Sequence, residues 1–383
     1  MLDKVLPGYK EIYKAYQFFA AEYYNATDMV VADSKGVFDK NLWHKAAEMG
    51  LHGLPVDKEF GGRSFSAMQT CAAFEGFAKG CNNNGLAFSI AAHAAASTLP
   101  MYFYGNDVQK KDLLPQLARG EVICANAITE LNSGSNVYEM ETVAVKDGDF
   151  YTINGHKCYI TNAPVADYIL LYCMTNVSKG FFGGVSAFML PANTKGLKRG
   201  DVKNKMGLKT VHMSEVILEN VKARKSFLLG EEGAGAVIFN ASMVWEKTIM
   251  CAMNLGQLER VYESTLAYCK KRKIKGKGLL GFTNIAHALA DVKIIINASR
   301  GLVYDAAYAI DTHSKDALQK SSIAKCFITE HAVKSIQKMQ TMYGGAGYLV
   351  ENEIEREYRD AFASLLYSGT TDIQRNIIIG HSN

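Results

Sequence analysis

The hydrophobic pattern of this chain changes period twice, and this change limits the possible folds more than any other feature. Apolar residues recur with helical spacing over residues 1–120. Short apolar runs bounded by turn residues replace that spacing over 121–225, and long helical stretches return over 226–383. The pattern predicts an α+β chain with an N-terminal helical domain, a middle antiparallel β domain and a C-terminal helical bundle within those three ranges.

Individual elements follow from the same pattern. The predicted helices are 42–49, ended by Gly50, then 68–77, 239–273, 282–308, 321–342 and 373–380. The predicted strands are 168–174, 185–190 and 215–218. Asn154-Gly155 lies between two apolar runs, 150–153 and 156–160, and this arrangement predicts a two-residue hairpin turn.

Composition excludes several classes of protein. Hydrophobic residues make up 48% and charged residues 21% of the 383, which is typical of a soluble globular protein. A net charge of +4 is too small to indicate a nucleic-acid partner, and we expect no membrane-spanning run. The eight cysteines show no CxxC spacing and no cluster with histidine, so we expect free thiols and no metal site. The N-terminus lacks an apolar signal core, and a cytoplasmic location is the expectation.

Two polar segments, 124–136 and 154–162, are candidates for a binding site. Thr129, Ser135 and the backbone N–H groups beside Gly134 offer hydrogen-bonding groups for a polar, planar cofactor. An ordinary polar turn is the alternative interpretation. The first segment resembles the T-E-P-x-x-G-S-D loop of flavin-dependent acyl-CoA dehydrogenases, and the second resembles their N-G-x-K-x-W-I-T-N segment.

That resemblance covers nearly the whole chain, from about residue 37 to the C-terminus. It implies the acyl-CoA dehydrogenase fold with a C-terminal four-helix bundle, bound FAD and a homotetramer. It implies that Thr129, Ser135 and Thr161 contact flavin or substrate, and that Tyr159 packs on the flavin where the family has tryptophan. Leu131 and Asn136 replace the family's proline and aspartate in the first loop.

The resemblance also implies FAD contacts in the C-terminal region. Arg272 matches an arginine that binds the FAD pyrophosphate, often across a subunit boundary, and a guanidinium suits that role because it pairs bidentately with phosphate. A solvated helix end is the alternative for this basic run. The other residues at family FAD-contact positions are Thr283, Thr341, Gly344, Gly345, Thr370 and Asp372. Thr283 and Thr341 each replace a glutamine of the family.

The resemblance implies α,β-dehydrogenation of an acyl thioester, which needs a base for the α-proton. Most family members take this base from Y-E-G-T, but this chain has Ser368 there. A subset that includes isovaleryl-CoA dehydrogenase places its glutamate on the long helix, at the position of Glu246. The sequence supports Glu246 separately, because it recurs at 4, 3, 4, 3 spacing with Phe239, Met243, Met250 and Met253 on one helix face. A rim glutamate paired with Lys247 or another cation is the alternative.

The substrate is suggested by differences from the family. The resemblance implies that the main-chain N–H of residue 368 binds the thioester carbonyl, and Ser135 and Lys247 are the other expected substrate contacts. Val244 and Lys247 replace an aspartate and an arginine that position CoA-linked substrates in the family, which suggests a substrate other than an ordinary acyl-CoA. Prolyl-carrier-protein oxidases share the fold and the helix-borne glutamate, and the resemblance to them implies a carrier-protein-bound aminoacyl group such as prolyl, in secondary-metabolite biosynthesis. A short or branched acyl-CoA is the alternative, followed by a flavin monooxygenase or a non-catalytic relative. The acceptor is electron-transfer flavoprotein or dioxygen, and the sequence fixes neither the acyl group, the acceptor nor the oligomer.

Overall fold

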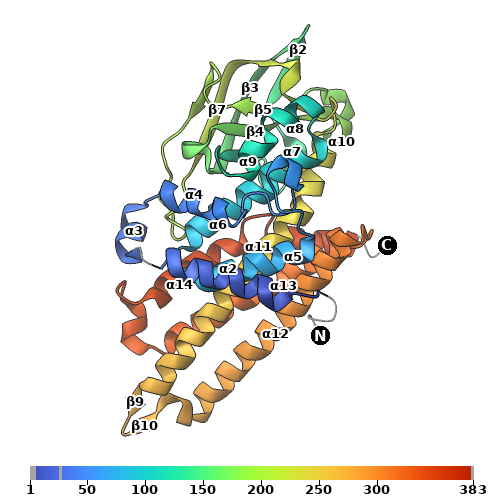
Figure 1. Ribbon diagram of the computed structural model, residues 1–383. Coiled ribbons are helices and arrows are strands. Elements are labelled where there is room, and N and C mark those ends of the chain that lie inside the picture. Colours follow the sequence, from blue (N-terminus) through green and yellow to red (C-terminus); the bar gives the residue numbers. More distant parts are fainter. Residues whose placement is uncertain (1–5, 26–27, 381–383) are drawn as a thin grey trace.

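The computed structural model describes residues 6–25 and 28–380. In Figure 1 a β-sheet forms one end of the molecule, and helices from both sides of it in the sequence pack together below. The mixed fold expected from the change in hydrophobic period is therefore confirmed. The helices before the sheet are α2 (Tyr9–Tyr23), α3 (Met29–Lys35), α4 (Lys40–Glu48), α5 (Ala67–Gly80), α6 (Asn84–His93), α7 (Leu99–Tyr104), α8 (Asp107–Asp112) and α9 (Leu114–Ala118).

One helical run in this region is unusually apolar. Helix α6, a π-helical turn over Ala94–Thr98 and α7 form a continuous segment, Asn84–Tyr104, that is long and apolar enough to cross a membrane by length and composition. This corrects the expectation that the sequence contains no such run. Most of its most apolar window, 83%, is buried inside the protein, which is how a core helix behaves.

The sheet has the strand order β6-β7-β3-β2-β4-β5-β8. Its strands are β1 (Cys124–Ala127), β2 (Val143–Asp147), β3 (Phe150–Thr161), β4 (Tyr168–Met174), β5 (Val185–Pro191), β6 (Leu197–Arg199), β7 (Met213–Arg224) and β8 (Leu228–Leu229), with the short helix α10 (Phe181–Gly184) before β5. The sheet is mainly antiparallel, but β1 pairs with β4 in parallel, and β2 meets β4 in parallel at one residue pair. The middle domain is therefore mainly antiparallel, as expected, and the parallel pairings of β4 with β1 and β2 are an addition that the sequence did not predict.

The predicted hairpin at Asn154-Gly155 is wrong, because β3 runs through both residues as one strand. The true β2–β3 turn is Gly148-Asp149, and Gly148 has φ of 59°. Gly155 instead lies at a bulge against β7, where an added Cβ would meet the Thr142 side chain at 2.3 Å. Glycine is required at position 155 because the Thr142 side chain lies against its backbone, and not because the chain turns there.

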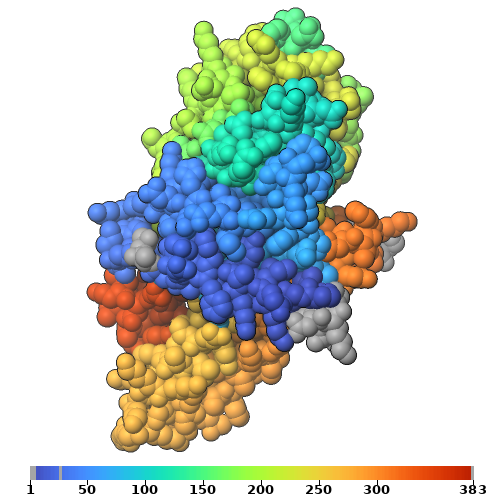
Figure 2. Space-filling view, viewed as in Figure 1, coloured from blue at the N-terminus to red at the C-terminus, as the bar shows by residue number. Residues whose placement is uncertain are grey.

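The C-terminal bundle is built around α11 (Gly235–Lys271), which packs against α12 (Thr283–Asp311) and α13 (Ala317–Thr341), with α15 (Thr371–Gly380) on α13. Helix α11 extends from the sheet to the hairpin of β9 (Lys273–Ile274) and β10 (Lys277–Gly278). In Figure 2 the gold and orange ends of α11 and α12 project beyond the rest of the surface.

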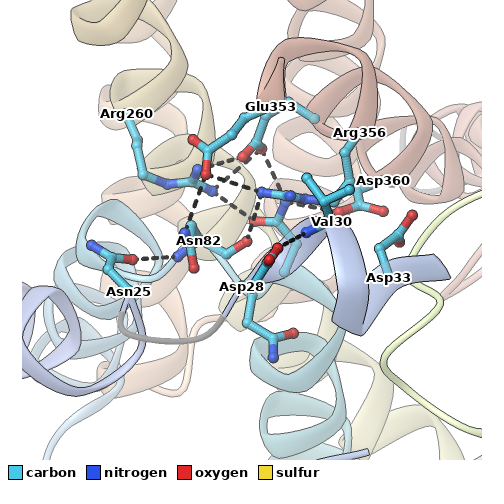
Figure 3. Close-up of polar contacts among 12 residues, drawn as sticks. Asn25, Asp28, Val30, Asp33, Asn82, Arg260, Glu353, Arg356 and Asp360 are labelled. Carbon is cyan, nitrogen blue, oxygen red and sulfur yellow. Dashed lines mark hydrogen bonds and ion pairs between the residues drawn. The ribbon is translucent and has the colours of Figure 1, made fainter. Parts of the chain in front are cut away.

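Helix α14 (Glu353–Phe362) was not predicted, although it ties the bundle to the N-terminal helices. Figure 3 shows Glu353, Arg356 and Arg260 gathered around Asn82, in the connection between α5 and α6. Asn82 Nδ2 donates to Glu353 at 3.2 Å, and Arg356 donates to the Asn82 carbonyl at 3.4 Å. These contacts fix the start of α6 relative to the bundle.

Candidate active site

Glu246 lies on α11 with only 9% of its surface exposed, as expected from the apolar face that carries it. Met250 and Met253 on the same face are buried in the core, whereas Phe239 and Met243 are partly buried. Burial raises the pKa of the Glu246 carboxyl above its usual value. The carboxylate forms no ion pair with Lys247; its hydrogen-bond donor is the Ser368 hydroxyl, 2.5 Å from Oε1. The alternative of a rim ion pair is therefore not what the structure shows.

The turn that carries Ser368 has an uncommon backbone. Ser368 has φ of 55° and Gly369 has φ of 81°, so two successive residues occupy the left-handed region. Thr370 follows, and its hydroxyl accepts a hydrogen bond from the Ile373 N–H at 3.4 Å. Asp372 is exposed at the start of α15 and pairs with Arg375 at 3.3 Å. The Ser368 hydroxyl and the Glu246 carboxylate thus come together from segments 122 residues apart.

The two polar segments of the sheet are joined by a buried ion pair that sequence reasoning missed. Lys157 Nζ lies 2.7 Å from Glu130 Oε1, and both side chains are almost completely buried. Burial alone would raise the pKa of Glu130, but Lys157 and the N–H groups of Glu141 and Thr142 lower it. Next to this pair, the carbonyl of Thr129 accepts from the Cys158 N–H at 2.9 Å. A charged residue in each segment was the available indication that the two segments meet.

The end of β3 carries two predicted site residues, Tyr159 and Thr161. Tyr159 has φ of 58° in a second bulge against β7, and the residue is 58% exposed. Thr161 follows and is partly buried. Asn162 then anchors the strand end, because its Oδ1 accepts from the Ser89 hydroxyl at 2.5 Å and its Nδ2 donates to the Ser89 carbonyl. Ser135, on the neighbouring loop, is exposed.

Helix α6 connects the end of β3 to the Ser368 turn. Ser89 binds Asn162, and the preceding residue Phe88 packs its ring on Tyr367, with centroids 4.7 Å apart. Tyr367 directly precedes Ser368. The structure therefore brings one set of predicted residues to the junction of sheet and bundle. This set comprises Thr129, Ser135, Tyr159, Thr161, Glu246, Ser368 and Thr370.

A second set of predicted residues lies at the opposite end of the bundle. Tyr268 near the end of α11 stacks on Tyr343 after α13, with centroids 4.1 Å apart, so the two helix ends are neighbours. Arg272, Thr283, Thr341, Gly344 and Gly345 all lie here and are exposed. Arg272 forms no ion pair with any residue that the structure describes.

The two sets are too far apart to bind one cofactor in a single chain. An α-helix rises about 1.5 Å per residue, so Lys271 lies about 38 Å along α11 from Glu246. That separation exceeds the length of an extended dinucleotide.

Lys247 does not face open space. Its side chain is buried, and its Nζ donates to the Ser322 hydroxyl of α13 at 2.9 Å. Burial lowers its pKa to about 8. The predicted role of Lys247 in substrate binding remains a prediction, and its observed contact is with the bundle.

The expectations for metal and disulfides can be compared with the described part of the chain. All eight cysteines are free thiols there, and seven of them are buried. Among residues 6–25 and 28–380, no group of three or more His, Cys, Asp and Glu side chains is arranged to hold a metal ion.

The fold and these motifs define a family. The family profiles for the N-terminal, middle and C-terminal domains of acyl-CoA dehydrogenase match residues 8–121, 125–221 and 233–382. The chain belongs to the acyl-CoA dehydrogenase family.

Relatives within the family are more specific. The chain is 36% identical to an L-prolyl-[peptidyl-carrier protein] dehydrogenase of a Serratia species, over 96% of this chain and 95% of that one. It is 34% identical to the solved prolyl acyl carrier protein oxidase AnaB, with a TM-score of 0.95 and coverage of 98% and 99%. The structure of PigA with FAD and proline gives the same identity and TM-score, with coverage of 98% and 97%. The CarC subunit of a caffeyl-CoA reductase-Etf complex from Acetobacterium woodii is 30% identical over 97% of each chain.

Proposed function

We propose that this protein is an FAD-dependent dehydrogenase that oxidises the Cα–Cβ bond of an acyl thioester, with L-prolyl on a carrier protein as its substrate. The observation that carries the proposal is the buried Glu246 carboxylate at the junction of sheet and bundle, with the Ser368 hydroxyl as its donor. Two of the similar proteins are named for prolyl groups on carrier proteins, and a third was solved with FAD and proline. A short or branched acyl-CoA is the second candidate, since it is the substrate class of the wider family.

The exposed residues of both sets fit a flavin dinucleotide. Tyr159 offers an exposed aromatic face for a planar ring system. Gly344 and Gly345 have nothing within 4 Å of an added Cβ, so a ligand can approach their backbone. Arg272 offers a guanidinium without an ionic partner among the described residues, which suits a pyrophosphate. We propose that FAD is held between the first set of one chain and the second set of another, in a homotetramer.

Two groups of this chain take part in the proposed reaction. Glu246, as a carboxylate, removes the proton from Cα, and its burial strengthens it as a base because a charged carboxylate is disfavoured there. The main-chain N–H of Ser368 binds the thioester oxygen and stabilises the negative charge that develops as the proton leaves. Bound FAD supplies the oxidant that takes the β-hydrogen with two electrons. The product is the α,β-unsaturated thioester, with the α-proton on Glu246.

Substrate and acceptor are tested together by anaerobic bleaching of the flavin. Purified protein is mixed with L-prolyl-carrier protein, free L-proline, isovaleryl-CoA and butyryl-CoA, and flavin absorbance is followed. Rapid bleaching by prolyl-carrier protein alone supports the proposal, whereas bleaching only by acyl-CoA reverses the order of candidates. Reoxidation by dioxygen or by electron-transfer flavoprotein is then compared, because relatives are named both as an oxidase and as part of an Etf complex. A colourless protein that binds no FAD would remove the enzyme proposal.

We also propose a cytoplasmic location. Eight free thiols are compatible with a reducing compartment, where disulfides rarely persist. Cell fractionation with an antibody against the chain tests this, and recovery in a secreted or membrane fraction would contradict it.

A further inference from the structure

A buried lysine of α13 binds the turn that carries Ser368. Lys325 is 1% exposed, and its Nζ donates to the Gly369 carbonyl at 2.7 Å. Gln374 of α15 donates to the carbonyls of Ser368 and Gly369, at 3.0 and 3.1 Å. Burying an ammonium group is costly, so a lysine whose observed contact is one backbone carbonyl requires an explanation.

The turn needs such support because of its backbone. Serine at φ of 55° carries a Cβ in the left-handed region, which disfavours this conformation relative to negative φ. Gly369 packs so tightly that an added Cβ would meet Gln374 Nε2 at 2.6 Å. A relaxed turn would move both the Ser368 hydroxyl and its main-chain N–H. The hydroxyl is the donor to Glu246, so the conformation of the turn and the surroundings of the base are linked.

We propose that Lys325 is a positioning residue for the reaction: by binding the Gly369 carbonyl, it holds the left-handed turn that directs the Ser368 hydroxyl to Glu246. This inference rests on the proposed function only in its kinetic test, which needs a substrate that reduces the flavin. The structural part concerns only the turn and the two side chains that meet across it.

A purely electrostatic role is the competing explanation. The ionisable groups that influence Glu246 are Lys247 on α11, Lys325 on α13, Tyr172 on β4 and Tyr367 beside the turn. Both tyrosines have pKa values raised by burial, so they remain neutral. Burial lowers the pKa of Lys325, like that of Lys247, to about 8. Lys247 therefore has the same charge and burial as Lys325, but it binds Ser322 rather than the turn, and it is the matched control.

The first test is amide hydrogen exchange of residues 366–374 in the FAD-loaded protein without substrate. Lys325→Met removes the ammonium group while keeping an apolar chain of similar length, and exchange at residues 368–370 is expected to rise by about tenfold or more. Lys247→Met and Lys325→Arg are expected to leave that exchange within about twofold of the original protein. Equal exchange in Lys325→Met and Lys247→Met would overturn the proposal. Should Lys325→Met fail to fold, Lys325→Leu, which also lacks a donor, takes its place with the same expectation.

The second test is a double-mutant cycle on the rate of flavin reduction by prolyl-carrier protein. Ser368→Ala is expected to slow reduction by about tenfold, and Lys325→Met by about 10- to 100-fold. The double variant is expected to be no slower than Lys325→Met, because a released turn no longer places the hydroxyl. Ser368→Ala combined with Lys247→Met is expected to be additive. Additive effects with Lys325→Met would contradict positioning through the turn. Failure of every thioester to reduce the flavin would refute the proposed function, while the exchange measurement would still decide the role of Lys325.

Discussion

The two ends of the α11 region have opposite electrostatic environments. At one end Glu246 is buried, its pKa is raised, and a serine of the same chain donates to it. At the other end six basic residues follow one another in exposed positions, and none forms an ion pair with a residue that the structure describes: Lys270, Lys271, Arg272, Lys273, Lys275 and Lys277. The buried end makes a proton acceptor with groups of one chain. The exposed end leaves its positive charge available for an anion, which we propose is the FAD pyrophosphate of another chain.

The largest expected effect is at the buried end. Glu246→Gln keeps the shape of the side chain but removes the base, so flavin reduction by prolyl-carrier protein should slow by about 10³-fold or more. Bound FAD, measured from the absorbance of the purified protein, should be unchanged. Flavin reduction at the original rate would show that the base lies elsewhere.

The next effect is at the exposed end. Arg272→Ala removes a charge-assisted contact of about 1.5–3 kcal/mol, so FAD should bind about 10- to 100-fold more weakly. Lys271→Ala, its neighbour, is the matched control and should change FAD affinity by less than about threefold. Titration of the apoprotein with FAD measures both. Equal weakening by the two variants would indicate general attraction by the basic end rather than a specific contact.

Dependence on pH should separate the two ends further. Glu246 acts as a base only when ionised, and its raised pKa places the acidic limb of flavin reduction above the usual range of a glutamate. The rate should rise with pH through that limb, by up to about tenfold per pH unit below the pKa. FAD affinity should stay nearly constant over the same range because a guanidinium remains charged. A flat rate profile from pH 5 to 8 would contradict the assignment of a buried base.

The smallest expected effect is that of salt. Raising the ionic strength from 0.05 to 0.5 M should weaken FAD binding by about two- to fivefold, because exposed charges are screened. The rate of flavin reduction in the fully loaded protein should change little, since Glu246 is buried and its donor is an uncharged hydroxyl. Stopped-flow measurements at saturating FAD separate the two responses.

Sequence reasoning predicted most of the fold because hydrophobic period is a local property. The strand at 168–174 was predicted with its observed bounds, and the three long helices were predicted to within a few residues. The hairpin was misplaced because Asn154-Gly155 has the composition of a turn. In the structure, Gly155 is needed because the Thr142 side chain lies where a Cβ would be. The real turn is Gly148-Asp149, and a glycine at the first of two turn positions is an equally good local pattern.

The candidate site was less accessible to sequence reasoning. The apolar spacing around Glu246 identified a buried carboxylate, and the family resemblance gave it a role. Neither could show that Ser368 donates to it, because that contact joins α11 to a turn 122 residues away. Lys325 was missed for the same reason: its backbone partner, the Gly369 carbonyl, carries no sequence pattern.

The buried pair of Glu130 and Lys157 places a constraint on how this chain can diverge. A single replacement at either position leaves a lone charge sealed inside the protein, a cost of about 3–5 kcal/mol when a buried pair is broken. Descendants are therefore expected to keep both residues or to exchange both together for an apolar couple. A library randomised at the two sites and selected for folded protein would reveal such covariation.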